Sequence, residues 1–287
     1  MSRTVLILGA SGFAGQAFDR AFSADGWRVR RFQRGTDPAQ AARGADLIVN
    51  AMNPPDYHDW ARQIPKITEL AMAAARASGA RVLIPGNVYV YGNQPGPWSA
   101  ETPHRACSRK GQIRVEMEAA WRASGLPVTI LRGGDFIDDQ RSGQAIGLVV
   151  LKKLHKGRIT AMGAPGVERA YAYLPDFARA AVALSKLGDL PVFADVALPG
   201  HSFSINDLAR EITRQSGREM KIGQFPWWAL RLSAPFWELG RELLEQRYLF
   251  DHPHRLCGEK FAALCPAFRH TPFEEMVGRL IQLHDAG

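Results

Sequence analysis

The sequence is poor in cysteine and has no long apolar run. Its 287 residues contain 3 cysteines, Cys107, Cys257 and Cys265, an odd number without the spacing of a disulfide framework or a zinc site. This excludes a disulfide-stapled scaffold and favours a reducing compartment. No stretch approaches the roughly 18 consecutive apolar residues that a membrane-spanning helix requires. The chain enters a strand-like run at once, so we expect no targeting segment. We therefore expect a cytoplasmic protein.

Lysine is also scarce, although the chain is basic. The 36 lysine and arginine residues against 28 acidic residues give a net charge of +8, and nearly all of the positive charge is arginine dispersed along the chain. A nucleic-acid-binding surface gathers its basic residues on one face, so we expect no nucleic-acid partner, and no membrane partner either. A hydrophobic content of 46% with 22% charged residues is typical of a folded globular chain.

Strand-like apolar runs alternate with helical stretches over the first half of the chain. We expect strands at residues 4–8, 27–32, 46–50, 81–85 and 127–132, and helices at residues 38–43, 60–78 and 111–124. Gly79 and Gly125 stand where helices commonly end. Alternation of this kind predicts a parallel sheet with helices on both faces. The expected fold class is therefore α/β, a Rossmann-like, doubly wound parallel sheet with a smaller, mostly helical C-terminal annex.

The second half is less regular. A helix is expected near residues 142–155, a segment at 171–176 leads into another helix ending near Leu187, and a strand follows at 192–196. From His201 onward the chain reads as mostly helical, with Ser204 as the N-cap of a helix at 205–216. We expect a dinucleotide-binding domain at 1–135, to which 171–197 adds a strand and a helix, and a substrate-binding annex at 136–170 and 198–287.

A glycine-rich turn follows the first predicted strand and opens a helix. Such a turn needs glycines because it is tight and because a diphosphate must approach backbone N–H groups at the helix N-terminus. Gly9, Gly12 and Gly15 have that spacing in that context. The turn residues predicted to contact the dinucleotide are Gly9, Ser11, Gly12, Phe13, Ala14 and Gly15. Within this set, Ser11 can add a hydroxyl to a phosphate, whereas Phe13 is expected to pack locally.

The end of the second predicted strand bears on which dinucleotide binds. A carboxylate there accepts hydrogen bonds from the adenosine ribose, whereas an arginine suits a 2′-phosphate. The sequence at this point is Phe32-Gln33-Arg34-Gly35, with no acid. We expect Arg34 to contact the phosphate and NADP(H) to be preferred over NAD(H), the alternative being that Arg34 is a solvated charge.

Five segments together resemble the extended and atypical branches of the short-chain dehydrogenase/reductase superfamily, which include the NAD-dependent epimerase/dehydratase family. They are Gly9–Gly15, Asn50–Asn53, Val90–Gly92, Leu131–Phe136 and Tyr173–Arg179, and the resemblance covers nearly the whole chain. It implies a Rossmann fold, a bound dinucleotide and a small-molecule substrate. It also implies cofactor contacts beyond the glycine turn, at Asn50, Ala51, Met52, Pro85, Gly86, Gly133 and Gly134.

The sequence departs from that family at each of its catalytic positions. The family uses a tyrosine acid/base, a lysine four residues later and a serine or threonine that orients the substrate oxygen. Alignment on Val90–Gly92 puts Asn87 at the serine or threonine position. The helix at 111–124 puts Lys110 at the tyrosine position and Arg114 at the lysine position.

These replacements leave two functions open. Arg114 can hold a ribose but is always protonated, Lys110 can act as acid/base where burial or cationic neighbours lower its pKa, and Asn87 can orient an oxygen. Tyr89 or Tyr91 can replace the missing phenol. The resemblance favours an NADP(H)-dependent oxidoreductase or epimerase-like enzyme with these unusual catalytic residues. The alternative is a dinucleotide-binding sensor or scaffold without catalysis.

The C-terminal part holds two further features. His252, His254 and Cys257 lie close together but lack a recognised ligand spacing, so we expect no metal site. The aromatic segment with Trp227, Trp228 and Trp237 suits core packing, a substrate pocket, a dimer face or a membrane surface. The sequence leaves a homodimer open and does not identify the substrate.

Overall fold

The computed structural model describes residues 2–140 and 144–285, and its centre is a six-stranded parallel sheet. The strand order is β2-β1-β3-β4-β5-β9, and every neighbouring pair is parallel. The strands are β1 (Thr4–Leu8), β2 (Arg28–Arg31), β3 (Leu47–Asn50), β4 (Arg81–Gly86), β5 (Val128–Arg132) and β9 (Phe193–Ala197). The α/β, Rossmann-like fold class is thereby confirmed.

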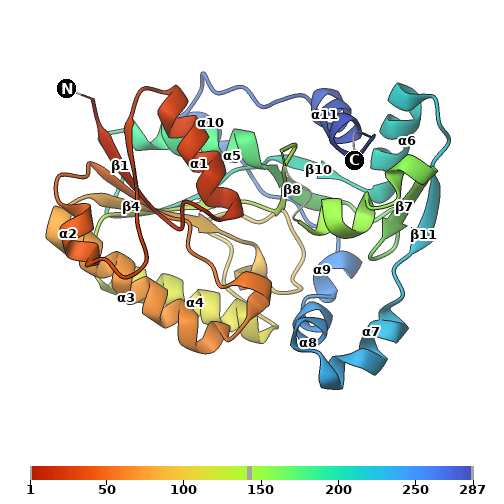
Figure 1. Cartoon of the computed structure of the whole chain (residues 1–287), viewed down its shortest axis with the longest axis horizontal. Coiled ribbons are helices and arrows are strands. Elements are labelled where there is room, and N and C mark those ends of the chain that lie inside the picture. The colour runs from red at the N-terminus through yellow and green to blue at the C-terminus, as the bar shows by residue number, and fades with distance from the viewer. Residues whose placement is uncertain (1, 141–143, 286–287) are drawn as a thin grey trace.

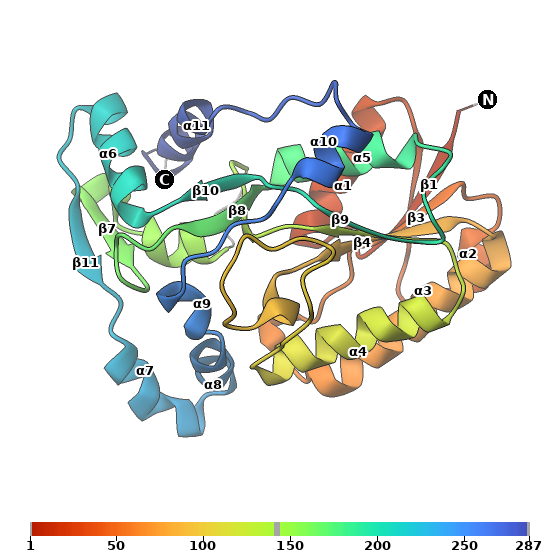
Figure 2. The same ribbon diagram turned by 180° about the vertical axis from the view of Figure 1, so that it is seen from behind.

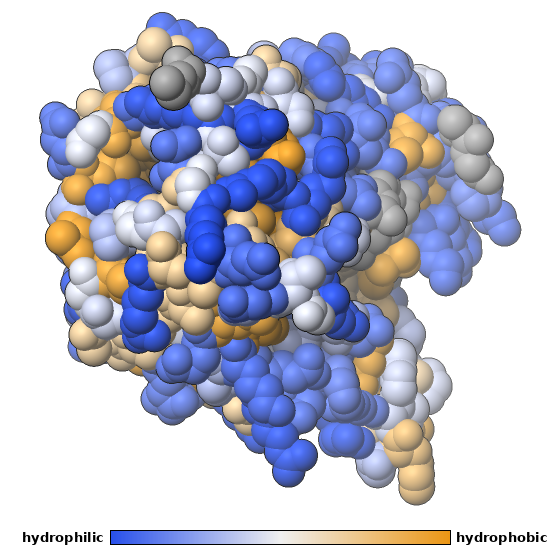
Figure 3. All heavy atoms as spheres, turned by 60° about the vertical axis from the view of Figure 1, so that its left-hand side comes forward, coloured by the Kyte–Doolittle hydropathy of each residue, from blue (hydrophilic) through white to orange (hydrophobic). Residues whose placement is uncertain are grey.

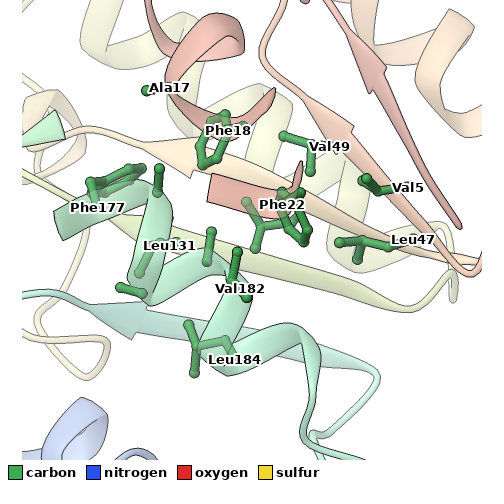
Figure 4. Close-up of a cluster of buried hydrophobic side chains, with 14 of the residues drawn as sticks. Val5, Ala17, Phe18, Phe22, Leu47, Val49, Leu131, Phe177, Val182 and Leu184 are labelled. Carbon is green, nitrogen blue, oxygen red and sulfur yellow. The ribbon is translucent and has the colours of Figure 1, made fainter. Parts of the chain in front are cut away.

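Helices cover both faces of this sheet, because its strands are apolar on both sides (Figures 1 and 2). One face is covered by α1 (Phe13–Ala24) and α5 (Leu174–Ser185), and Figure 4 shows their phenylalanines packed onto the strands. The opposite face is covered by α2 (Pro38–Ala42), α3 (Trp60–Ser78) and α4 (Arg109–Ala123). Gly79 ends α3 in the left-handed conformation, as the sequence predicts.

Two small sheets and several short helices form the annex beside the carboxyl edge of the main sheet (Figures 1 and 2). The sheets consist of β6 (Asp135–Ile137), β8 (Arg169–Tyr173) and β10 (His201–Phe203), and of β7 (Arg158–Ala161) and β11 (Lys221–Gln224). The helices of the annex are α6 (Ile205–Ser216), α7 (Trp227–Ser233), α8 (Glu238–Glu245), α9 (Tyr248–Asp251) and α11 (Phe273–Asp285), whereas α10 (Glu259–Leu264) packs against β9 of the main sheet. Short 3-10 turns lie at η1 (Pro55–Tyr57), η2 (Tyr89–Tyr91), η4 (Leu154–Lys156) and η5 (Ala234–Phe236).

The annex differs from the sequence-based expectation in two places. The helix expected at 142–155 is, in its described part, a π-helical turn η3 (Ile146–Val150) and the turn η4, while residues 142 and 143 lie outside the described residues. The mostly helical region after His201 also holds strands β10 and β11. The segment at 171–176 leads into a helix, α5, as the sequence predicts, and its strand β8 pairs with β6 and β10. Short strands of this kind are stabilised by their pairing partners, which local sequence does not reveal.

No helix among the described residues is both long and apolar enough to cross a membrane.

Candidate functional site

The strand order reverses at β1. The chain passes from β1 to β2 on one side and returns to β3 on the other side, so the crevice at the carboxyl ends of β1 and β3 is where ligands bind in open sheets of this type. The glycine turn lies there, and its contacts show why glycine is needed. Gly9 has a φ of +80°, and a Cβ on it would lie 2.9 Å from the backbone nitrogen of Met52. A Cβ on Gly15 would lie 2.1 Å from the carbonyl oxygen of Gly9.

Gly12 is different, because its neighbours leave it open. A Cβ there would meet only the Gly9 carbonyl oxygen, at 3.2 Å. Gly12 is also the N-cap of α1 and has no side chain to cap the helix. An open glycine at a helix N-terminus, at the switch point of the sheet, is the cradle that a diphosphate requires. These residues therefore fit a dinucleotide.

The other predicted cofactor residues surround this crevice. The Ala51 N–H donates to the Leu8 carbonyl at 2.9 Å, and the buried Asn50 accepts from the Met52 N–H at 3.4 Å. These contacts place the loop after β3 beside the glycine turn.

The ends of β4 and β5 meet on the far side of β3. The Gly133 N–H donates to the Gly86 carbonyl at 3.0 Å, and Pro85 pairs with Leu131. A Cβ on Gly134 would lie 2.1 Å from the Ala170 carbonyl oxygen, so packing alone accounts for that glycine. Their contact with a cofactor stays a prediction.

Arg34 lies just beyond the end of β2, where the sequence predicts it, and its contact with a cofactor stays a prediction. A hollow of about 500 Å³ opens at the end of β2, but Arg34 is exposed and is not among its lining residues. The lining includes the carboxylate Asp37 as well as Arg30 and Arg31, and Arg31 is paired with Asp19. A carboxylate at this edge is the feature that suits an unphosphorylated ribose.

A cluster of aromatic and polar side chains lies at the carboxyl ends of β3 and β4. The hydroxyls of Tyr57 and Tyr89 are 3.2 Å apart and hydrogen-bonded. The Arg114 guanidinium lies 4.7 Å from the centre of the Trp60 ring and donates to the Asn53 side-chain oxygen at 2.8 Å. We refer to Asn53, Tyr57, Trp60, Tyr89 and Arg114 as the tyrosine cluster.

Arg114 is a buried cation without a counterion. It is 9% exposed, and among the described residues no carboxylate pairs with it and its Nε has no hydrogen-bond partner. Burial lowers the pKa of this guanidinium. A buried cation of this kind costs free energy unless a ligand oxygen completes its contacts.

Burial also sets the chemistry of the two phenols. It raises the pKa of Tyr89 well above its ordinary value, and the nearby Tyr57 and Asp135 raise it further. Burial likewise raises the pKa of Tyr57, although the hydrogen bond with Tyr89 acts in the opposite direction. Both phenols are therefore protonated at neutral pH and suited to donate a proton rather than to accept one.

The loop that carries Tyr57 has an unusual backbone. Asp56, Tyr57 and Asp59 have φ angles of 51°, 59° and 44°, in the left-handed region that residues other than glycine rarely adopt. Such conformations cost about 1 kcal/mol or more each and gather at functional sites. The hydrogen bond with Tyr89 and the ring contact with Trp60, 5.4 Å between centres, hold the loop in place.

Lys110 lies next to the tyrosine cluster but is engaged by two carboxylates. Its Nζ contacts the carboxylates of Glu242 and Glu245 on α8, the latter at 2.9 Å, and its side chain is 2% exposed. Its backbone N–H also donates to Glu245, at 2.7 Å. The cationic neighbours considered from the sequence are absent from these contacts, and anions take their place. These ion pairs make Lys110 a link between α4 and helix α8 of the annex.

Asn87 is held by its own turn. Its side-chain oxygen accepts from the Tyr89 N–H at 3.1 Å, and its carbonyl accepts from Arg132 at 2.7 Å. Arg132 is fully buried and paired with Glu118 at 2.9 Å and Asp195 at 2.5 Å. Asn87 thus orients Tyr89 through the backbone, and a buried ion network supports the turn.

Sequence reasoning placed Asn87, Tyr89, Lys110 and Arg114 in one region, and the structure brings them together. It did not include Glu242 and Glu245, since nothing local marks a carboxylate that reaches across from the annex. Pro54-Pro55 after the third strand marks a loop near the expected nicotinamide site, and the sequence thereby predicts Tyr57, His58 and Trp60 as secondary candidates for substrate contact. The structure places Tyr57 and Trp60 beside Tyr89.

The structure places the histidines considered as metal ligands in other roles. His254 is buried and stacks on Trp98 with ring centres 4.9 Å apart. The His, Cys, Asp and Glu side chains that converge among the described residues are His104, Glu118 and Asp195. Arg132 already pairs with both carboxylates there.

No protein-family model matches the chain, and no curated protein matches it by sequence. Solved structures do match. UDP-glucuronic acid 4-epimerase from Bacillus cereus, in complex with UDP-glucuronic acid and NAD, matches with a TM-score of 0.76 and 14% identity over 98% of this chain and 99% of that chain. A putative epimerase from Burkholderia cenocepacia J2315 matches with a TM-score of 0.75 and 18% identity over 100% and 99%. RMD from Pseudomonas aeruginosa, complexed with NADPH, matches with a TM-score of 0.74 and 15% identity over 100% of both chains.

At these identities the likeness establishes the fold, which this chain shares with NAD-binding epimerases and dehydratases of nucleotide sugars. The predicted preference for NADP(H) over NAD(H) is contradicted. The epimerase contains NAD, further matching structures are NAD-bound or NAD-dependent, and RMD is the one of those named here with NADPH.

Proposed function

We propose that this chain is an NAD(H)-binding enzyme of the epimerase/dehydratase type, which transfers hydride to or from a carbon that bears a hydroxyl or carbonyl group in a small molecule. The observation that carries the proposal is the tyrosine cluster. A hydroxyl pair and an unpaired buried cation lie at the carboxyl edge of the sheet that also holds the glycine cradle. Nucleotide sugars are the first substrates to test, because the matching structures contain or act on them.

Different residues of the chain bind the cofactor, orient the substrate and donate the proton. Gly9, Gly12 and Gly15 allow the backbone at the start of α1 to hold the diphosphate. A bound nicotinamide supplies the hydride. Arg114 offers positive charge to an oxygen of the ligand, and Tyr89 donates a proton to the substrate oxygen, with Tyr57 as its hydrogen-bond partner.

The raised pKa of Tyr89 keeps this phenol protonated at neutral pH, which is the state that the reductive direction requires. A phenol that stays protonated through the neutral range can give its proton to a developing alkoxide, but it is a poor base for oxidation. We therefore expect the reduction rate to stay constant through neutral pH and to fall only in alkaline solution, as the phenol ionises.

The test is turnover by the Tyr89→Phe variant, with NADH and a panel of nucleotide sugars and simple carbonyl compounds. Loss of the proton donor should lower kcat about 100-fold or more, while NADH affinity stays nearly unchanged. Tyr91→Phe is the matched control, because its hydroxyl donates to the Ser99 carbonyl at 2.7 Å, away from the cluster. Full activity of Tyr89→Phe would remove Tyr89 from the mechanism.

A second function is favoured by Lys110. Lys110 contacts two carboxylates and, among the described residues, lacks the cationic neighbours that would suit a lysine to acid/base catalysis. This arrangement suits a dinucleotide-binding protein without catalysis. NADH binding without turnover on any member of the panel supports this second function over the first.

A further inference from the structure

Four large apolar side chains are exposed on one projection of the annex. Trp228 is 69% exposed, Leu232 71%, Phe236 94% and Trp237 46%. The first three are spaced four residues apart, so they follow one line along α7 and the turn η5. We refer to these four side chains as the apolar stripe.

The apolar stripe is not the core-facing side of α7. That side is formed by Trp227 and Leu230, which are buried against Met162 and Phe250. The Trp227 indole also donates to the Met162 carbonyl at 2.6 Å. A helix that is apolar on two sides usually packs against a second surface as well. None of the described residues packs over the apolar stripe.

The negative charges near the apolar stripe are paired with cations, whereas two positive charges near it have no carboxylate partner in the part of the chain that the structure describes. The carboxylates of α8 are engaged: Glu238 lies 2.9 Å from the His58 imidazole, and Glu242 and Glu245 bind Lys110. Arg231 and Arg241 are exposed, and among the described residues neither forms an ion pair with a carboxylate, although Arg241 donates to the Ala234 carbonyl at 3.1 Å. The free charge beside the stripe is therefore positive.

The shape of the projection also bears on its partner. In Figures 1 and 2, α7 and α8 extend from the body of the molecule, and Figure 3 shows apolar side chains at the end of this lower lobe. A narrow convex end is poorly suited to the broad, self-complementary contact that a symmetric dimer needs. It is well suited to entering the boundary between headgroups and acyl chains.

We propose that the apolar stripe, with Arg231 and Arg241, docks on an anionic lipid surface. Tryptophan, phenylalanine and leucine next to arginine are the residues that lie in a membrane interface. The tryptophan rings would lie at headgroup depth, Leu232 and Phe236 would enter the acyl region, and the guanidiniums would contact lipid phosphates. This surface is separate from the dinucleotide site.

The test is sedimentation of the full-length chain with vesicles of phosphatidylcholine alone or mixed with phosphatidylglycerol. We expect binding to the mixed vesicles, weakened by salt, together with a blue shift of tryptophan fluorescence. The double variant Leu232→Ser/Phe236→Ser should bind about tenfold or more weakly. Arg231→Gln/Arg241→Gln should bind phosphatidylglycerol several-fold more weakly.

Two control variants separate the stripe from general effects. Val192→Ser removes another exposed apolar side chain, 55% exposed, and Arg43→Gln removes another exposed cation. Both should bind vesicles as the natural chain does, and all variants should keep its unfolding midpoint. Equal vesicle binding by the stripe variants, or none by the natural chain, overturns the proposal. A dimer in gel filtration that the stripe variants dissociate overturns it in favour of a second copy of the chain.

Discussion

At the scale of the residue, the same position can carry different chemistry depending on its neighbours. Lys110 stands where the resembled family has a catalytic tyrosine, and a buried lysine among cations would be a candidate acid/base. The structure surrounds it with Glu242 and Glu245, which stabilise its charge. Tyr89 is instead a phenol whose hydroxyl is hydrogen-bonded to a second phenol, Tyr57. The sequence could place both residues near one another, but it could not show which carboxylates reach Lys110 from the distant annex.

This role of Lys110 predicts a change in stability rather than in binding. Lys110→Met leaves two carboxylates facing each other without their cation and should lower the free energy of unfolding by about 2 kcal/mol, measured by urea denaturation. Replacing both partners as well, in Lys110→Met/Glu242→Gln/Glu245→Gln, should recover part of the loss. NADH affinity should not change. A single variant that unfolds normally but loses turnover would return Lys110 to the catalytic residues.

At the scale of the element, two glycines in the turn between β1 and α1 have different roles, one in packing of the backbone and one in binding of the ligand. A Cβ on Gly15 collides with backbone at 2.1 Å, whereas one on Gly12 is 3.2 Å from its nearest neighbour and otherwise faces open space. The glycine spacing identified the turn from the sequence alone, but the spacing does not show which glycine serves folding and which serves the ligand.

Paired alanine variants measure that division. Gly15→Ala should lower the free energy of unfolding by about 2 kcal/mol, because backbone must move to admit the Cβ. Gly12→Ala should cost less than about 1 kcal/mol yet weaken NADH binding about tenfold or more, since its Cβ would stand where the diphosphate approaches. The assignment of the cradle fails if Gly12→Ala binds NADH as the natural chain does.

Elements with a strong periodic pattern were predicted well, and the weakly patterned ones were not. The helix at Trp60–Ser78 begins and ends as predicted, because an apolar face and Gly79 mark it. Ser204 caps α6 as expected, with Asp207 completing a reciprocal capping pair. The strands β10 and β11 have three and four residues and depend on pairing with β8 and β7. Such pairing joins segments far apart in the sequence.

At the scale of the whole molecule, the annex is joined to the sheet domain beside the tyrosine cluster. Two links from α8 cross between them: Glu238 to His58, and Glu242 with Glu245 to Lys110. These links place the α7–α8 projection next to the candidate site while leaving its outer side to solvent (Figure 1). Part of the net charge of +8 is located at these two places: Arg114 is buried at the candidate site, and Arg231 and Arg241 lie beside the apolar stripe.

Calorimetric titration of the purified chain with NADH and NADPH measures whether the switch point of the sheet holds NAD(H). We expect one saturable NADH site and weaker binding of NADPH, since the carboxylate Asp37 lines the hollow at the end of β2. Tighter binding of NADPH would contradict the assignment of the cofactor. Absence of binding by either dinucleotide would contradict the account of the site as a whole.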